Sequence, residues 1–109
     1  MSSHLDLVRF RLLQKLEIKA HASQRELARE LGVSLGSINF CIKEFVNNKV
    51  LKVETTEHSH YKRTYAYHIT KKGRSEKVTI IKKALALRLE DYDAVKKDIS
   101  DLKSELDKS

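Results

Sequence analysis

The sequence predicts a mainly α-helical domain with a small β-hairpin, continued by a long C-terminal helix. The chain of 109 residues has no proline and only three glycines, which favours helices joined by short connections. β-branched and aromatic residues gather in 50–56 and 61–69, as is typical of strands. From Val78 onward, apolar residues recur every seven positions, which indicates one long helix with a single apolar seam.

Three helices are expected before the hairpin. Apolar residues between Leu5 and Ile18 have the spacing of an amphipathic helix. Ser23 and Glu26 form a capping box, in which the Ser23 hydroxyl accepts from the Glu26 amide and the Glu26 side chain reaches back. Ser34 is suited to cap a third helix that runs to about Asn48.

The hairpin and the last helix follow directly. Its strands are expected at Val50–Thr56 and Tyr61–Ile69, with a polar connection between them. Thr70 is suited to cap the last helix, which is expected to continue almost to Ser109.

Residues 24–43 have the pattern of two helices that cross through a short turn. Ala28 is small enough for a close crossing, and Gly32 tolerates the positive φ that the turn needs. Apolar anchors follow at Val33, Ile38 and Cys41. We therefore predict a winged helix-turn-helix, with the hairpin as the wing and the last helix as a dimerisation element.

The third helix is expected to bury one stripe and to present the opposite face to the major groove of DNA. Asn39 has the amide that pairs with adenine, Phe40 or Leu35 suits a thymine methyl group, and Gly36 allows close approach of the backbone. Alternatively, Phe40 packs against another part of the chain. The predicted DNA-binding residues are Ser23, Gln24, Arg25, Ser34, Leu35, Gly36, Ser37, Asn39, Phe40, Lys43, Lys62 and Arg63.

The charge distribution supports a polyanionic partner. The chain carries a net charge of +7. Residues 1–75 contain 14 Lys and Arg against 7 Asp and Glu, whereas residues 76–109 contain 8 of each. We therefore divide the chain into a DNA-binding domain (1–75) and a dimerisation helix (76–109). A basic surface can also serve solubility alone, and the same fold can serve as a protein-interaction module.

Other classes of function find little support in the sequence. No apolar run has the ~20 residues that span a bilayer, and the first residues lack the apolar stretch of a signal peptide, so we expect a cytoplasmic protein. The lone Cys41 excludes an intrachain disulfide and a multi-cysteine zinc site. We expect no catalysis, no cofactor and no metal, and we interpret His58, His60 and His68 as groups that give DNA affinity a pH dependence.

The last helix predicts a homodimer. Its two heptad series form a seam over four repeats that is broken only by Arg88, with Leu89 beside the break. The chain's own first helix explains only the first two turns of this seam, and a second copy of the chain explains the rest. The relative direction of the two helices stays open. The predicted dimerisation residues are Val78, Ile81, Leu85, Leu89, Tyr92, Val95, Ile99, Leu102 and Leu106.

The run SQRELARELGVSLGSINFCIKEFVNNKVLKV, the wing and the step from Ile69 to Gly73 resemble MarR-type regulators. The closest likeness is to the small subgroup of EPS-associated MarR-family regulators, which implies a transcriptional regulator near bacterial exopolysaccharide genes. Arg63 matches the wing arginine of that family, although the position of its acidic partner is occupied by Tyr61. The N-terminal helices that help to form an effector pocket in typical members have no counterpart here, so we expect no small-molecule effector.

Overall fold

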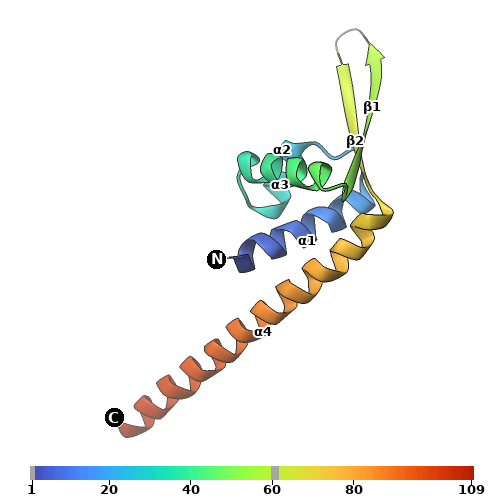
Figure 1. The fold of residues 1–109 in the computed structure, drawn as a ribbon. Helices are drawn as coiled ribbons and strands as arrows, with labels where there is room; N and C mark the ends of the chain where they lie inside the picture. Colours follow the sequence, from blue (N-terminus) through green and yellow to red (C-terminus); the bar gives the residue numbers. More distant parts are fainter. Residues whose placement is uncertain (1, 60–61) are drawn as a thin grey trace.

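The structure is a computed structural model that describes the backbone of residues 2–59 and 62–109 and the side chains of residues 5–56 and 64–109. Its elements follow the predicted order (Figure 1). They are α1 (Ser2–Ile18), α2 (Gln24–Leu31), α3 (Leu35–Asn47), β1 (Leu51–Ser59), β2 (Lys62–Ile69) and α4 (Lys71–Lys108). The predicted fold class is confirmed: three helices and an antiparallel wing precede one long helix.

The helix ends lie where the sequence places them. Ser34 and Thr70 cap α3 and α4 through their hydroxyl groups, which accept from the amides of Ser37 at 3.1 Å and Gly73 at 2.9 Å. Gly32 ends α2 with a φ of 68°. The Val33 amide then donates to the Ala28 carbonyl at 3.0 Å, which closes the turn between α2 and α3.

The wing differs from the prediction at its tip. We expected the first strand to end at Thr56, but β1 extends to Ser59. The strands pair in register from Leu51 opposite Ile69 to Glu57 opposite Arg63, and an irregularity follows before Ser59 pairs with Lys62. The polar sequence of this stretch does not end the strand, because the backbone hydrogen bonds of a two-stranded ribbon form without an alternation of apolar and polar residues.

The core lies where α1, α2, α3 and the base of the hairpin meet. Leu12, Leu13 and Leu16 of α1 are almost completely buried. Its other members come from every element of the winged domain: Ala22, Leu27, Ala28, Ile38, Cys41, Ile42, Phe45, Val50, Leu51 and Tyr67. The Tyr67 amide donates to the Ala20 carbonyl at 3.0 Å, which ties the wing to the connection between α1 and α2.

The end of α3 and the start of α4 meet at Val50. The Val50 carbonyl accepts from the Thr70 amide at 3.0 Å and from the Thr70 hydroxyl at 3.2 Å. Gly73 packs on the same carbonyl so closely that a Cβ atom at this position would collide with the Val50 oxygen. The glycine therefore allows the first turn of α4 to cross the start of β1.

Helix α4 runs antiparallel to α1 and then continues beyond it (Figure 1). Lys77 near the start of α4 contacts Glu17 near the end of α1 at 2.5 Å. Ala84 is buried on this face, with Ile80 and Leu87 half-buried on either side. The molecule is consequently elongated: its longest dimension is 72 Å, and its radius of gyration is 18.8 Å, against about 13 Å for a compact chain of this length.

Within the described ranges 2–59 and 62–109, none of the helices combines the length and the apolar character needed to cross a membrane.

We predict that Gly73→Ala lowers the free energy of unfolding by about 1–3 kcal/mol, because the new methyl group overlaps the Val50 carbonyl and lies 2.9 Å from Ile69 Cγ2. Gly36→Ala is the matched control. A Cβ at Gly36 meets only the Ser34 hydroxyl, at 3.9 Å, and alanine is the better helix former. Urea unfolding followed by circular dichroism at one chain concentration compares the two. Equal stability of both variants would show that the crossing does not need the glycine.

Candidate nucleic-acid interface

Helix α3 divides into a buried and an exposed face, as predicted. Ile38, Cys41, Ile42 and Phe45 are buried in the core. The opposite face presents Leu35, Gly36, Asn39, Phe40 and Lys43, of which only Asn39 is half-buried. Such a face, which is small, polar and basic with two apolar residues, has the width and chemistry of a helix that reads the major groove.

Phe40 and Leu35 stay at the surface. Their side chains are 55% and 41% exposed. Phe40 is therefore not buried in the core, and its packing against another part of the chain or against DNA stays a prediction. Both residues are available to an external partner, such as a thymine methyl group.

Gly36 lies in the first turn of α3 with open space around it. Its φ is not among the positive values, which belong to Gly32 and Lys49 in the described backbone. No contact or conformation within the described chain therefore requires a glycine here. A glycine at the exposed start of a recognition helix lets the backbone come close to a groove or a phosphate.

Two serines at this end of α3 already have partners inside the chain. The Ser34 hydroxyl accepts from the Ser37 amide and lies 2.9 Å from the Ser37 hydroxyl. Both hydroxyls are exposed and keep further hydrogen-bonding capacity. The first amides of the helix lack intrahelical partners and point outward with the positive end of its dipole, which favours a phosphate.

The start of α2 and the wing together form a hollow that sequence reasoning missed. Ser23 and Gln24 line it together with Thr64 and Tyr65 of β2. Tyr65 is 45% exposed, although Tyr67, two positions further along the same strand face, is buried. The α1–α2 connection covers only the base of the hairpin, and the alternation of side chains along β2 gives no sign of where that cover ends.

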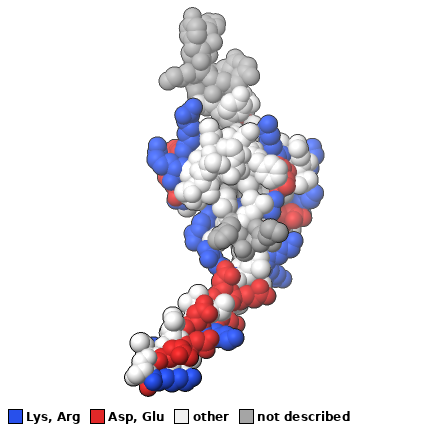
Figure 2. Space-filling view, turned by 90° about the vertical axis from the view of Figure 1, so that its left-hand side faces the viewer, with Lys and Arg blue, Asp and Glu red and all other residues white. Residues whose placement is uncertain are grey.

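Positive charge prevails on the winged domain, and most of the acidic surface in Figure 2 lies along α4. Arg25 and Lys43 are exposed and form no ion pair with any side chain that the structure describes. Most of the described acidic residues of the winged domain instead form ion pairs in which α1 or Lys19 takes part: Asp6, Glu17, Glu26, Glu30 and Glu44. Arg25 and Lys43 are thus among the cations of the winged domain that have no ion pair with a described side chain.

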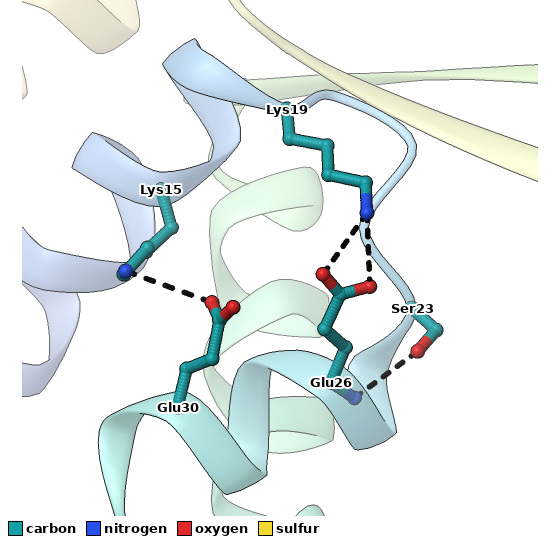
Figure 3. A network of polar contacts seen from close by, with 5 residues as sticks. All are labelled: Lys15, Lys19, Ser23, Glu26 and Glu30. Atoms are coloured by element: carbon teal, nitrogen blue, oxygen red, sulfur yellow. Dashed lines mark hydrogen bonds and ion pairs between the residues drawn. The ribbon is translucent and has the colours of Figure 1, made fainter.

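Two ion pairs join α2 to the end of α1 and the connection after it, and Figure 3 shows both. Lys15 contacts Glu30 at 3.6 Å, and Lys19 donates to both oxygens of Glu26 at 3.0 and 3.3 Å. The bonds from Lys19 hold the pKa of the Glu26 carboxyl below its ordinary value. Ser23 caps α2 as expected, at 3.1 Å from the Glu26 amide. The predicted return bond of the capping box is wrong, because Lys19 competes for the Glu26 carboxylate.

Arg9 fixes α1 against α3. Its guanidinium contacts Glu44 of α3 at 2.5 Å and Asp6 of α1 at 3.4 Å. Asp6 is buried, and the Nε atom of Arg9 is buried without a partner among the described atoms. Because the Arg9 guanidinium is largely buried, losing Glu44 or Asp6 would leave part of its charge without a partner, and this loss would be costly.

Several candidate residues of the wing lie outside the described side chains. They are Lys62 and Arg63, together with His58 and His60. His68, which is described, lies 3.2 Å from Glu54 across the hairpin. Among the described side chains, no three His, Cys, Asp or Glu residues gather in a group that would hold a metal ion. Burial raises the pKa of the Cys41 thiol, which therefore stays protonated at neutral pH.

The apolar seam of α4 is exposed along its whole length. Helix α1 covers the neighbouring face, around Ala84, and leaves the seam open even where the two helices run side by side. The predicted dimerisation residues are between 36% and 74% exposed: Val78, Ile81, Leu85, Leu89, Tyr92, Val95, Ile99, Leu102 and Leu106. Leu7 and Phe10 of α1 border the same apolar surface beside Ile81 and Leu85, and sequence reasoning did not include them.

Comparison with known proteins agrees with this architecture. Residues 5–52 match a family model described as winged helix-turn-helix DNA-binding. No curated protein matches the chain. The family model and the fold agree on a winged helix-turn-helix.

Several solved structures have a similar fold. The transcriptional regulator MosR of Mycobacterium tuberculosis aligns with a TM-score of 0.58 and 16% identity over 94% of this chain and 76% of its own. FabT of Streptococcus pneumoniae, solved in complex with DNA, aligns with a TM-score of 0.52 and 17% identity over 91% and 73%.

A MarR transcriptional regulator from Methanosarcina mazei Go1 aligns with a TM-score of 0.52 and 17% identity over 76% of this chain. The alignment covers 60% of that regulator, less than two thirds of its length. At these identities the likeness shows the fold, a winged helix-turn-helix.

We predict that base contacts and phosphate contacts separate by residue on this surface. Asn39→Ala is expected to cost about 1–3 kcal/mol of binding on a duplex selected for tight binding, and little on random duplexes, because a base contact is lost. Lys43→Ala is expected to weaken binding to both duplexes similarly, because a phosphate contact carries no sequence information. Fluorescence anisotropy on both duplexes measures the two effects. An Asn39→Ala variant that loses affinity equally for both would rule out base reading by Asn39.

Proposed function

We propose that this chain is a MarR-type transcriptional regulator that binds double-stranded DNA through α3 and the wing. The exposed outer face of α3 is the observation that supports this most directly, because it offers an amide, a glycine and a cation beside two apolar side chains. The DNA complex of the structural neighbour FabT supports the same use of the fold.

In this proposal α3 lies in the major groove. Asn39 pairs with an adenine, and Phe40 or Leu35 contacts a thymine methyl group. Gly36 and the first amides of α3 approach the phosphate backbone. Ser23, Gln24 and Arg25 hold the phosphates on one side of the groove, with Tyr65 of the wing beside them.

The wing then follows the duplex. Lys62 and Arg63 are proposed to contact phosphates or the minor groove, whose negative potential attracts arginine. This part of the proposal rests on their positions in the sequence of the hairpin.

We further propose that the chain acts as a homodimer through the seam of α4. A long row of exposed apolar side chains, interrupted at Arg88, is unusual on a monomeric protein and marks an interaction surface. Its extension onto Leu7 and Phe10 of α1 widens this surface where the winged domain begins. A two-fold dimer would present two α3 helices to half-sites about 34–36 Å apart.

The proposed target genes of this regulator are exopolysaccharide genes. Regulation of exopolysaccharide genes rests on the resemblance of the LGSINFCIK run and the Thr-Lys-Lys-Gly step to the EPS-associated subgroup. Genome-wide mapping of bound sites tests it directly.

A second candidate function uses the same surface differently. The exposure of Leu35 and Phe40 on α3 also suits a protein partner, as in winged-helix interaction modules. A protein partner would not be displaced by rising salt in the way that a polyphosphate is.

We predict that the chain binds duplex DNA with a steep dependence on salt. If about six phosphates are neutralised, affinity falls roughly a thousandfold between 50 and 200 mM salt. Titration of random and genomic duplexes at several salt concentrations measures the slope, and sedimentation of the complex gives the number of chains per duplex. Absence of binding, or affinity that ignores salt, would contradict the proposal and favour the protein-interaction module.

A further inference from the structure

The residues that flank the apolar seam of α4 are sorted by charge in its free half. Along one edge of the seam, an acidic residue comes directly before each of Tyr92, Ile99 and Leu106. These acids are Asp91, Asp98 and Glu105. On the side that follows Val95 and Leu102 stand the bases Lys96 and Lys103. In heptad terms, the g positions are acidic and the e positions are basic. We call these five residues the flanking charges.

The outer face of the same helix segment is not sorted in this way. Positions away from the seam carry both signs without sorting: Glu90, Asp93, Lys97, Asp101, Asp107 and Lys108. A general need for solubility would be met by mixed charge on both faces. The sorting is therefore a property of the seam's edges, where a second helix would lie.

The flanking charges form only long contacts, or no ion pair, with other described side chains of this chain. Residues 88–109 are all exposed. Of the ion pairs in the described part of α4 beyond Ala84, Asp91 contacts Arg88 at 4.0 Å and Glu105 contacts Lys108 at 3.7 Å. Lys96 lies 5.4 Å from the centre of the Tyr92 ring, and Asp98 and Lys103 form no ion pair with a described side chain. The flanking charges are therefore available to pair with the charges of a second helix.

The direction of the second helix decides whether the flanking charges of the two helices attract or repel each other. In a parallel pair in register, each g residue faces the following e residue of the partner. Asp91 then faces Lys96 of the partner subunit, and Asp98 faces Lys103 of the partner subunit. In an antiparallel pair, g faces g and e faces e, so that acids meet acids and lysines meet lysines. Only the parallel arrangement is self-complementary.

We infer that the C-terminal part of α4, from Leu89 to Leu106, forms a parallel two-stranded coiled coil with a second copy of this chain. This inference rests on the homodimer proposed above and adds its direction and register. One heptad of the seam, with Ile99 at a and Leu102 at d, has the β-branched and leucine pair that favours two strands in parallel coiled coils. Tyr92, Val95 and Leu106 do not follow this rule, so the direction rests on the flanking charges.

The geometry of the chain supports the same direction. A parallel pair keeps both winged domains at one end of the coiled coil, where α3 of each copy can reach one face of a duplex. An antiparallel pair centred on Tyr92 would separate the starts of the two α4 helices by roughly 60 Å, which is well beyond a half-site spacing of about 34–36 Å.

Arg88 marks where the two helices part. It occupies a d position, where a parallel pair would bring it against Arg88 of the partner subunit. Its guanidinium instead lies near Asp91, toward the edge of the seam. On the N-terminal side of Arg88, Leu7 and Phe10 of α1 lie beside the exposed Ile81 and Leu85 of α4. The apolar surface is therefore broader where the two helices diverge toward the winged domains.

Charge reversal in the full chain tests the direction. The half-reversed variant Lys96→Glu/Lys103→Glu is expected to dimerise roughly 10- to 100-fold more weakly, because four attractive contacts in the parallel dimer become repulsive. Adding Asp91→Lys and Asp98→Lys reverses both edges and is expected to restore dimerisation. The matched control Lys97→Glu/Lys108→Glu changes the same charge on the outer face and is expected to have little effect. Sedimentation equilibrium without DNA gives the dissociation constants.

The outcomes separate direction from assembly. In an antiparallel dimer, the half-reversed variant keeps like charges facing each other and dimerises as the unchanged chain does, so that result overturns the parallel direction alone. A chain that is monomeric at all concentrations overturns both the direction and the homodimer. Because no DNA is present, neither result depends on whether α3 binds a duplex. A weakened half-reversed variant that the full reversal rescues supports the parallel coiled coil.

Discussion

The structure depends on the junction at Val50, where α3, the wing and the long helix α4 meet. The Val50 amide closes the end of α3 by donating to the Phe45 carbonyl at 2.8 Å. The Val50 carbonyl accepts from Thr70, and Gly73 packs on its other side. One buried residue thus fixes the direction in which α4 leaves the winged domain. If this junction were loose, α3 and the seam of α4 could not be held at a constant angle.

Helix α1 reinforces this arrangement from the opposite side. Its leucines supply the core, Arg9 holds Glu44 of α3, and Glu17 holds Lys77 of α4. These contacts engage acidic residues on the α1 side of the domain, and Arg25 and Lys43 stay exposed near the proposed interface.

Sequence reasoning was most accurate where local chemistry decides the structure. Ser23, Gly32, Ser34 and Thr70 mark helix ends through hydrogen bonds to neighbours in the sequence. It failed where distant groups compete. Lys19 takes the Glu26 carboxylate from the predicted capping box, and the α1–α2 connection decides that Tyr67 is buried while Tyr65 is exposed. The seam of α4 was visible in the sequence, but the contribution of Leu7 and Phe10 depends on how α1 lies beside it. The same holds for Gly73, whose need is set by a carbonyl far away in the chain.

The central claim is that a rigid domain gains specific affinity by being joined to a second copy through α4. Replacing Ile99→Asp and Leu102→Asp together places charge in the seam, and Ala94→Asp with Ser100→Asp adds the same charge to the outer face. Mass by sedimentation and affinity for a selected two-site duplex are measured for both variants. The account predicts that the seam variant is a monomer with affinity lowered by about 10²–10⁴-fold, while the control stays dimeric and binds normally. A seam variant that remains dimeric and binds its duplex as the unchanged chain does would contradict it.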